Sequence, residues 1–168
     1  MSRARPAAAL LLMLAACSAP SSVGMSEDEV AAELANLRIA PGRWRLVTKV
    51  LDASGPDLPR DIRNRMIGPR NDLTTCITPA QAARPQANFL ALGEARRCAY
   101  SALEIRSGRL RGSMRCGPMD VRIVGRFAAD AFETRMFNGS PVPGGGTMLV
   151  TLRGAGRRLG NCAQGDTK

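Results

Sequence analysis

The residues most able to take part in covalent chemistry are the five cysteines, at positions 17, 76, 98, 116 and 162. The chain contains no histidine, and no two cysteines have C-x-x-C spacing. Structural zinc and haem sites generally depend on such residues, so we expect neither a metal nor a cofactor. The thiols are instead expected to carry one lipid and to form two disulfides.

The first cysteine follows a short export signal. Two arginines precede an apolar run at positions 7–14, which is too short to cross a bilayer as a helix. The sequence LAAC at positions 14–17 matches a bacterial lipobox, in which small residues precede a cysteine that accepts an acyl chain. We therefore expect Cys17 to be lipidated. An ordinary signal peptide with an incidental Cys17 is the alternative.

Lipidation of Cys17 would define the N-terminal part of the chain and its location. Residues 1–16 are expected to be a lipoprotein signal peptide, and residues 17–25 a tether between the lipid and the folded domain. Ser18 stands where an aspartate usually retains such lipoproteins in the inner membrane, so by analogy we expect the outer membrane, facing the periplasm. This compartment is oxidising, which favours disulfides over free thiols.

The segment from Cys98 to Cys116 is predicted to be a β-hairpin closed by its own disulfide. Ser107-Gly108 is a two-residue turn signal between two arms that can pair. The apolar alternation changes parity near positions 101–102, which indicates a β-bulge. With this bulge, Cys98 faces Cys116 closely enough for a bridge.

The remaining two cysteines, Cys76 and Cys162, then form the second predicted disulfide. It would tie the end of the domain to its first third. For the hairpin pair, Cys98 and Cys116, two reduced thiols in the core are the alternative.

Short apolar alternations between turn residues predict a mainly β fold, with Trp44 as a core anchor. We expect an antiparallel meander of about seven strands forming a curved sheet or a partly closed barrel. This β domain is expected to span residues 39–162, after an amphipathic helix at 26–38 and before a disordered tail at 163–168. Strands are expected at 43–51 and 72–77, in the two hairpin arms, and at 119–127, 132–136 and 147–153; a short helix is expected at 80–83, and connecting segments at 52–69, 138–146 and 154–160.

Arginine dominates the charge of the chain. The formal net charge is +10, and all 24 basic residues except Lys49 and Lys168 are arginine. An arginine surface can bind lipid phosphates or other anions, whereas a GC-rich genome is the alternative explanation of the arginine content. The inner face of the sheet is predicted to be a solid core rather than a groove for an acyl chain. The outward positions of the central strands are predicted to form an anion-binding stripe, made of Arg109, Arg111, Arg115, Arg122, Arg126 and Arg135.

Four short motifs together suggest a family. They are Pro41-Gly42-Arg43-Trp44, Cys76-Ile77-Thr78-Pro79, the Cys98 and Cys116 pair around a Ser-Gly turn, and Arg157-Arg158-Leu159-Gly160-Asn161-Cys162. Over residues 39–162 the chain resembles the domain of unknown function 3617 family of small exported proteobacterial proteins. The resemblance implies an exported, cysteine-bridged β domain without an established activity, and it supplies no catalytic residues.

These observations favour a non-enzymatic cell-envelope lipoprotein of unknown biochemical role. We expect it to be held at the membrane through Cys17 and to bind an anionic lipid, a glycolipid or an envelope protein. Nucleic acid is not expected as a partner, because aromatic residues make up only 4% of an exported chain. The alternative is a periplasmic carboxylate-dependent hydrolase, with candidate residues Glu104, Asp120, Asp130 and Glu133.

Overall fold

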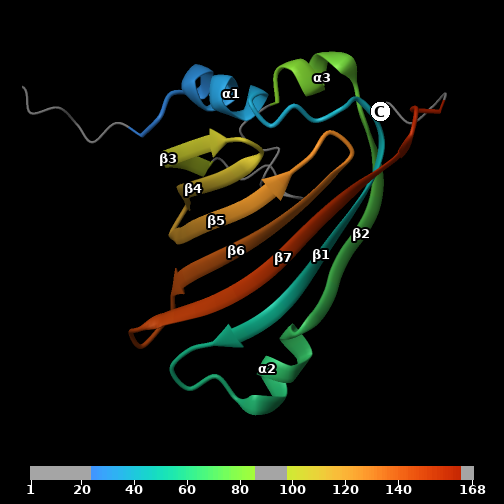
Figure 1. Cartoon of the computed structure of the whole chain (residues 1–168). Helices are drawn as coiled ribbons and strands as arrows, with labels where there is room; N and C mark the ends of the chain where they lie inside the picture. The colour runs from blue at the N-terminus through green and yellow to red at the C-terminus, as the bar shows by residue number, and fades with distance from the viewer. Residues whose placement is uncertain (1–23, 86–97, 164–168) are drawn as a thin grey trace, which may run out of the picture.

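The computed structural model describes residues 24–85 and 98–163, which form one seven-stranded antiparallel sheet with three helices (Figure 1). The predicted meander is confirmed, and the sheet is open rather than closed. Its spatial order is β2-β1-β7-β6-β5-β4-β3, so β2 and β3 lie at opposite edges although they follow each other in the chain. The strands are β1 (Gly42–Ser54), β2 (Gly68–Ile77), β3 (Cys98–Arg106), β4 (Arg109–Cys116), β5 (Met119–Phe127), β6 (Ala131–Pro141) and β7 (Thr147–Gly160), and the helices are α1 (Glu27–Ala35), α2 (Arg60–Met66) and α3 (Pro79–Ala83).

The helix α1 packs its apolar side against the inner face of the sheet and closes the core. It starts with a capping box, in which Ser26 and Glu29 satisfy each other's backbone N–H groups. Val30 and Leu34 are buried in the same cluster as Trp44 and Tyr100. Burying each such side chain stabilises the fold by roughly 1.5–3 kcal/mol. A helix as short as α1 is marginally stable alone, so its packing against the sheet provides most of its stability. The side chains of α1 therefore belong to the same buried apolar cluster as the inner face of the sheet.

The predicted hairpin register is confirmed in detail. Cys98 lies opposite Cys116 and forms a disulfide with it, and the register shifts between Tyr100 and Ala102, where the bulge was expected. Ser107 and Gly108 both have positive φ values, 49° and 72°, as a type I′ turn requires.

The second predicted disulfide, between Cys76 and Cys162, is also present, and it closes the largest covalent loop. Its Cα atoms are 5.6 Å apart, and the two cysteines are separated by 86 residues. Because β2 and β7 both pair with β1, the bridge joins the end of β2 to the residues just after β7.

The predicted connection at 52–69 is wrong in part. β1 continues to Ser54, the helix α2 follows, and β2 already begins at Gly68 rather than at position 72. The long pairing of β1 with both β2 and β7 extends these strands beyond their apolar alternation. Arg63 fixes α2 on β1 by donating to the backbone oxygen of Ala53 at 2.9 Å and pairing with Asp52 at 2.6 Å.

Two further predicted connections are also wrong, because 138–146 belongs partly to β6 and 154–160 belongs entirely to β7. β6 continues to Pro141, and β7 continues through the glycine-rich stretch to Gly160. Glycines here allow close packing, since a Cβ added at Gly156 would lie 2.1 Å from the Phe132 ring. The sequence suggested a break because glycine usually weakens strands, but the neighbouring aromatic ring needs the space.

Candidate functional site

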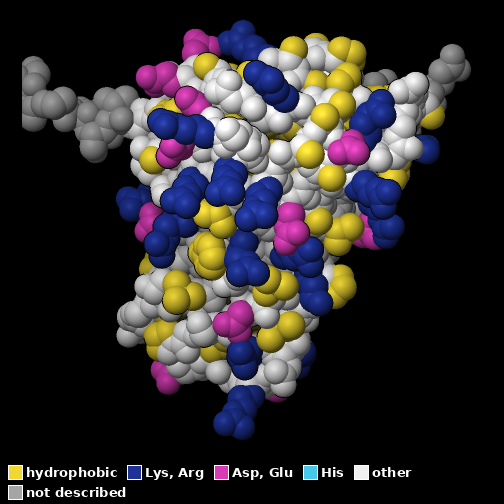
Figure 2. Space-filling view, in the orientation of Figure 1, with side chains coloured by type: hydrophobic (Ala, Val, Ile, Leu, Met, Phe, Trp, Pro, Cys, Tyr) yellow, Lys and Arg dark blue, Asp and Glu magenta, His cyan; other side chains and the backbone are white. Residues whose placement is uncertain are grey.

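All six predicted arginines are exposed and lie on the outer face of β4, β5 and β6, opposite the face that packs against α1. Figure 2 shows Lys and Arg side chains gathered over the middle strands of the sheet. The register brings Arg109 directly opposite Arg126, and Val124 between Arg111 and Arg135. Opposed like charges such as Arg109 and Arg126 cost a few tenths of a kcal/mol to about 1 kcal/mol. The same register also places Glu133 opposite Arg126 and Glu104 opposite Arg111.

Five of these six arginines make no ion pair with any described residue. Arg115 is the exception, because its Nε donates to Asp120 Oδ1 at 2.9 Å. The unpaired members are Arg109, Arg111, Arg122, Arg126 and Arg135. Guanidinium groups without a protein partner are free to bind external carboxylates or phosphates in a bidentate manner.

The structure adds two cations that the sequence did not place in this group. Arg153 on β7 lies opposite Arg135, and Lys49 on β1 lies opposite Arg153. Arg153 also pairs with Glu133 at 3.0 Å. Both were missed because the pairing of β1 with β7 joins distant parts of the chain, and no local signal reveals it.

Exposed apolar side chains cross the same outer face as a diagonal ridge. Val124 and Phe137 are each 41% exposed and Leu149 is 55% exposed. Val124 and Phe137 are diagonal neighbours across β5 and β6, and Phe137 and Leu149 across β6 and β7. We call these three residues the apolar ridge. The outer arginine face denotes the surrounding cations, Lys49, Arg109, Arg111, Arg122, Arg126, Arg135 and Arg153.

Paired arginines elsewhere on the molecule behave differently from this face. Arg45 donates from Nε to Asp72 Oδ1 at 2.8 Å, and this hydrogen bond lowers the pKa of the Asp72 carboxyl. A hydrogen bond from Arg63 lowers the pKa of Asp52 in the same way. Each of these arginines therefore has a carboxylate that already neutralises it.

The carboxylates proposed for a hydrolase are not gathered into a cleft. Glu104 pairs with Arg106 at 2.8 Å, Asp120 with Arg115, and Glu133 with Arg153. Asp130 lies exposed in the turn between β5 and β6 and forms no ion pair with any described residue. In the described part of the chain, no group of three or more Cys, Asp or Glu residues could hold a metal ion.

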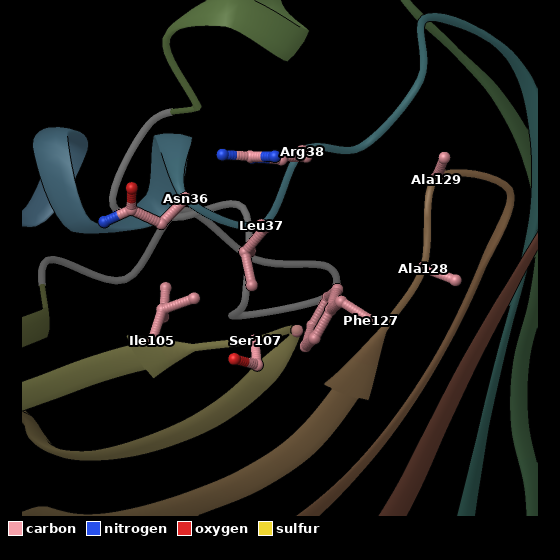
Figure 3. Close-up of a pocket in the computed structure, with 9 residues that line it drawn as sticks. Asn36, Leu37, Arg38, Ile105, Ser107, Phe127, Ala128 and Ala129 are labelled. Carbon is pink, nitrogen blue, oxygen red and sulfur yellow. The ribbon is translucent and has the colours of Figure 1, made fainter.

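A half-open cavity lies where the chain leaves α1 and passes the tip of the β3–β4 hairpin (Figure 3). Its volume is about 630 Å³. The walls come from three places: the residues after α1, the hairpin tip, and the end of β5 with the two residues that follow it. This cavity was not predicted from the sequence, because it depends on how α1 sits on the sheet.

The predictions for the two ends of the chain concern residues outside the described ranges. Cys17, its lipobox and most of the tether precede Gly24, and most of the predicted C-terminal tail follows Ala163. Within residues 24–85 and 98–163, no helix is long and apolar enough to cross a membrane.

Comparison with known proteins identifies a family and no function. The family described as "Protein of unknown function (DUF3617)" matches residues 39–162, which include all seven strands. The comparisons with curated proteins and with solved structures gave no match. The matched residues make up well over half of the 168-residue chain, and the chain therefore belongs to the DUF3617 family.

Proposed function

We propose that this protein is a non-enzymatic lipoprotein of the cell envelope that binds an anionic amphiphilic surface through its outer arginine face. It is exported to the periplasm and tethered to the outer membrane by a lipid on Cys17. The surface it binds carries phosphate groups, as the headgroups of anionic lipids and glycolipids do. The observation that carries the proposal is the set of unpaired arginines held in register around the apolar ridge.

The chemistry of the face suits a lipid surface. Each arginine or lysine near an anionic membrane contributes roughly 1 kcal/mol of attraction, and the unpaired arginines can add these contributions. Exposed Phe137 and Leu149 can enter the region between the headgroups while the arginines bind phosphate. A surface that interleaves cations with apolar side chains thus matches both parts of a lipid.

The position of the described chain start limits the distance between the domain and the membrane. Met25 donates its backbone N–H to the oxygen of Tyr100 at 2.7 Å, so the described chain begins beside β3. Only six residues lie between Cys17 and Gly24, and the seven residue steps reach at most about 25 Å. A lipid on Cys17 would therefore hold the β3 edge of the sheet within about 25 Å of the membrane.

Binding to vesicles tests the proposal directly. The chain carrying Cys17→Ser, which has no lipid, should co-sediment with vesicles that contain phosphatidylglycerol and not with pure phosphatidylcholine vesicles. Because binding depends on exposed charge, it should weaken strongly between about 0.05 M and about 0.5 M salt. Equal binding to both vesicle types, or binding that salt does not change, would contradict the role of the arginines.

The lipid anchor has its own test. Cells given labelled palmitate should incorporate the label into the wild-type protein and not into Cys17→Ala. Equal labelling of both proteins would show that Cys17 is not the acylated residue.

A further inference from the structure

We propose that the cavity at the end of α1 is a binding site for a small amphiphilic organic anion, with Arg38 contacting the anionic group. This site goes beyond the membrane-binding face, because it uses different residues and does not need the lipid anchor. The ligand class is a short apolar chain that carries one carboxylate or phosphate.

The lining of the cavity separates into an apolar wall and a polar rim. Leu37, Ile105 and Phe127 are largely buried and present apolar surface. Asn36, Arg38 and Ser107 supply an amide, a guanidinium and a hydroxyl. Figure 3 shows Arg38 and Asn36 on one side of the cavity and Ser107 on the opposite side. A ligand with one polar end and one apolar end matches this division.

The charge of the lining selects an anion. Among the nine described residues that line the cavity, Arg38 is the one with a charged side chain. It forms no ion pair with any residue of the described segments, so its guanidinium is available for a carboxylate or phosphate. The volume of about 630 Å³ lies within the range of small-molecule sites and holds far more than one or two waters.

Two turns meet at this cavity. Two of the three non-glycine residues with positive φ in the described chain line it, Arg38 at 52° and Ser107 at 49°. Ser107 adopts this conformation as part of the type I′ turn at the hairpin tip, and Arg38 adopts it just after α1, where helices commonly end in the left-handed region. The end of α1 and the hairpin tip therefore place a guanidinium and a hydroxyl at the same cavity.

The cavity walls are also fixed before any ligand arrives. Ala40 donates its backbone N–H to Ala129 at 2.8 Å, and Phe127 donates to Gly108 at 2.7 Å. These bonds connect the segment after α1 to the end of β5, and the end of β5 to the hairpin tip. A preformed site loses little conformational freedom on binding, which favours even a small ligand.

Titration with octanoate, octyl phosphate and octanol tests the site, using the chain with Cys17→Ser. We expect saturable binding of at least one of the two anions at one per chain, and at least about tenfold weaker binding of octanol. The two anions distinguish carboxylate from phosphate recognition. Octanol binding as tightly as both anions, or no saturable binding of either, would overturn the proposal.

Two variants separate ligand contact from structural support. Arg38→Gly removes the guanidinium and also relieves the positive φ, so the anion should bind at least about tenfold more weakly while the melting temperature stays equal or rises. Arg38→Gln should weaken binding similarly. Unchanged anion affinity in both variants would remove Arg38 from the site.

A cavity-filling variant and a surface control complete the design. Ala128→Trp, at an exposed lining position, should abolish anion binding. Arg135→Gln, on the outer arginine face, should leave octanoate and octyl phosphate affinity unchanged. If Ala128→Trp loses anion binding and keeps normal vesicle binding, the two functions lie on separate surfaces. If Ala128→Trp binds the anion normally, the cavity is not the site.

Discussion

Two regions of this molecule use arginine in opposite ways. At one corner, the start of β1, the end of β2 and the end of β7 meet, and we call this the disulfide corner. There Arg158 donates from Nε to Pro41 oxygen at 2.8 Å and from Nη2 to Asn161 Oδ1 at 2.9 Å. On the outer arginine face, five arginines have no partner within the described residues. Arginine at the corner holds the fold together, while arginine on the face is available to something outside the protein.

The same corner contains most of the residues that suggested the family. Trp44 is buried, donates to Ala40 oxygen at 3.0 Å and stacks with Phe132 at 5.9 Å between ring centroids. A Cβ at Gly42 would lie 2.3 Å from the oxygen of Gly160, so these two motifs pack against each other. The family motifs therefore describe how the sheet is fastened. A family match based on them identifies the fold without assigning an activity.

The largest expected effect lies in the disulfide corner. Replacing Cys76 and Cys162 by alanine opens a loop of 86 residues and should lower the free energy of unfolding by roughly 4–5 kcal/mol. The matched control is Cys98→Ala with Cys116→Ala, which opens an 18-residue loop and should cost about 3 kcal/mol. Urea unfolding of both double variants measures the difference. A larger loss from the hairpin pair would contradict the ranking by loop length.

The next effect concerns Tyr100, which anchors β3 beneath the start of the described chain. Burial raises the pKa of Tyr100 to about 12, above its ordinary value of 10.0. The folded state therefore holds its proton more tightly than the unfolded state does. This stabilisation is complete below pH 10 and is lost as the pH rises towards 12, by up to roughly 2–3 kcal/mol.

Tyr100 is the only tyrosine, so phenolate absorbance reports on it alone. The titration midpoint of the folded protein should lie near pH 12, and Tyr100→Phe should reduce the alkaline loss of stability. A midpoint near pH 10 in folded protein would show that the ring is not buried as described.

A smaller effect compares one arginine from each region. Arg158→Gln should lower stability by about 1–2 kcal/mol, because it removes charge-assisted hydrogen bonds at the corner, and it should leave vesicle binding unchanged. Arg135→Gln should change stability by at most about 0.5 kcal/mol, since it removes a like charge opposite Arg153. It should nevertheless weaken binding to anionic vesicles about fivefold. The reverse pattern would exchange the roles assigned to the two regions.

Local sequence signals were sufficient for the hairpin and for the outward direction of its arginines. The turn at Ser107-Gly108, the change of parity near 101–102 and the cysteine spacing together predict the register that pairs Cys98 with Cys116 in the structure. These features act over short distances along the chain. Once the hairpin was correct, the second disulfide followed by elimination.

Features that depend on pairing between strands far apart in the sequence could not be predicted from local patterns. No local sequence pattern shows that Gly156 of β7 packs against Phe132 or that β7 pairs with β1. The sequence therefore predicts a connection where the second half of β7 lies. The same pairing brings Lys49 and Arg153 to the outer arginine face. The cavity beside Arg38 likewise depends on the docking of α1 across the sheet, which apolar periodicity in the helix predicts only in general.

The most direct test of the account is a comparison of two fourfold variants at equal net charge, both in the Cys17→Ser chain. The first replaces unpaired face arginines by glutamine, at Arg111, Arg122, Arg126 and Arg135. The second replaces four exposed arginines elsewhere, at Arg60, Arg65, Arg70 and Arg84. The face variant should partition into phosphatidylglycerol vesicles roughly a hundredfold to a thousandfold less than the parent, and the control variant within a few-fold of it. Equal losses in the two variants would show that net charge alone drives binding, and would contradict a site on the outer arginine face.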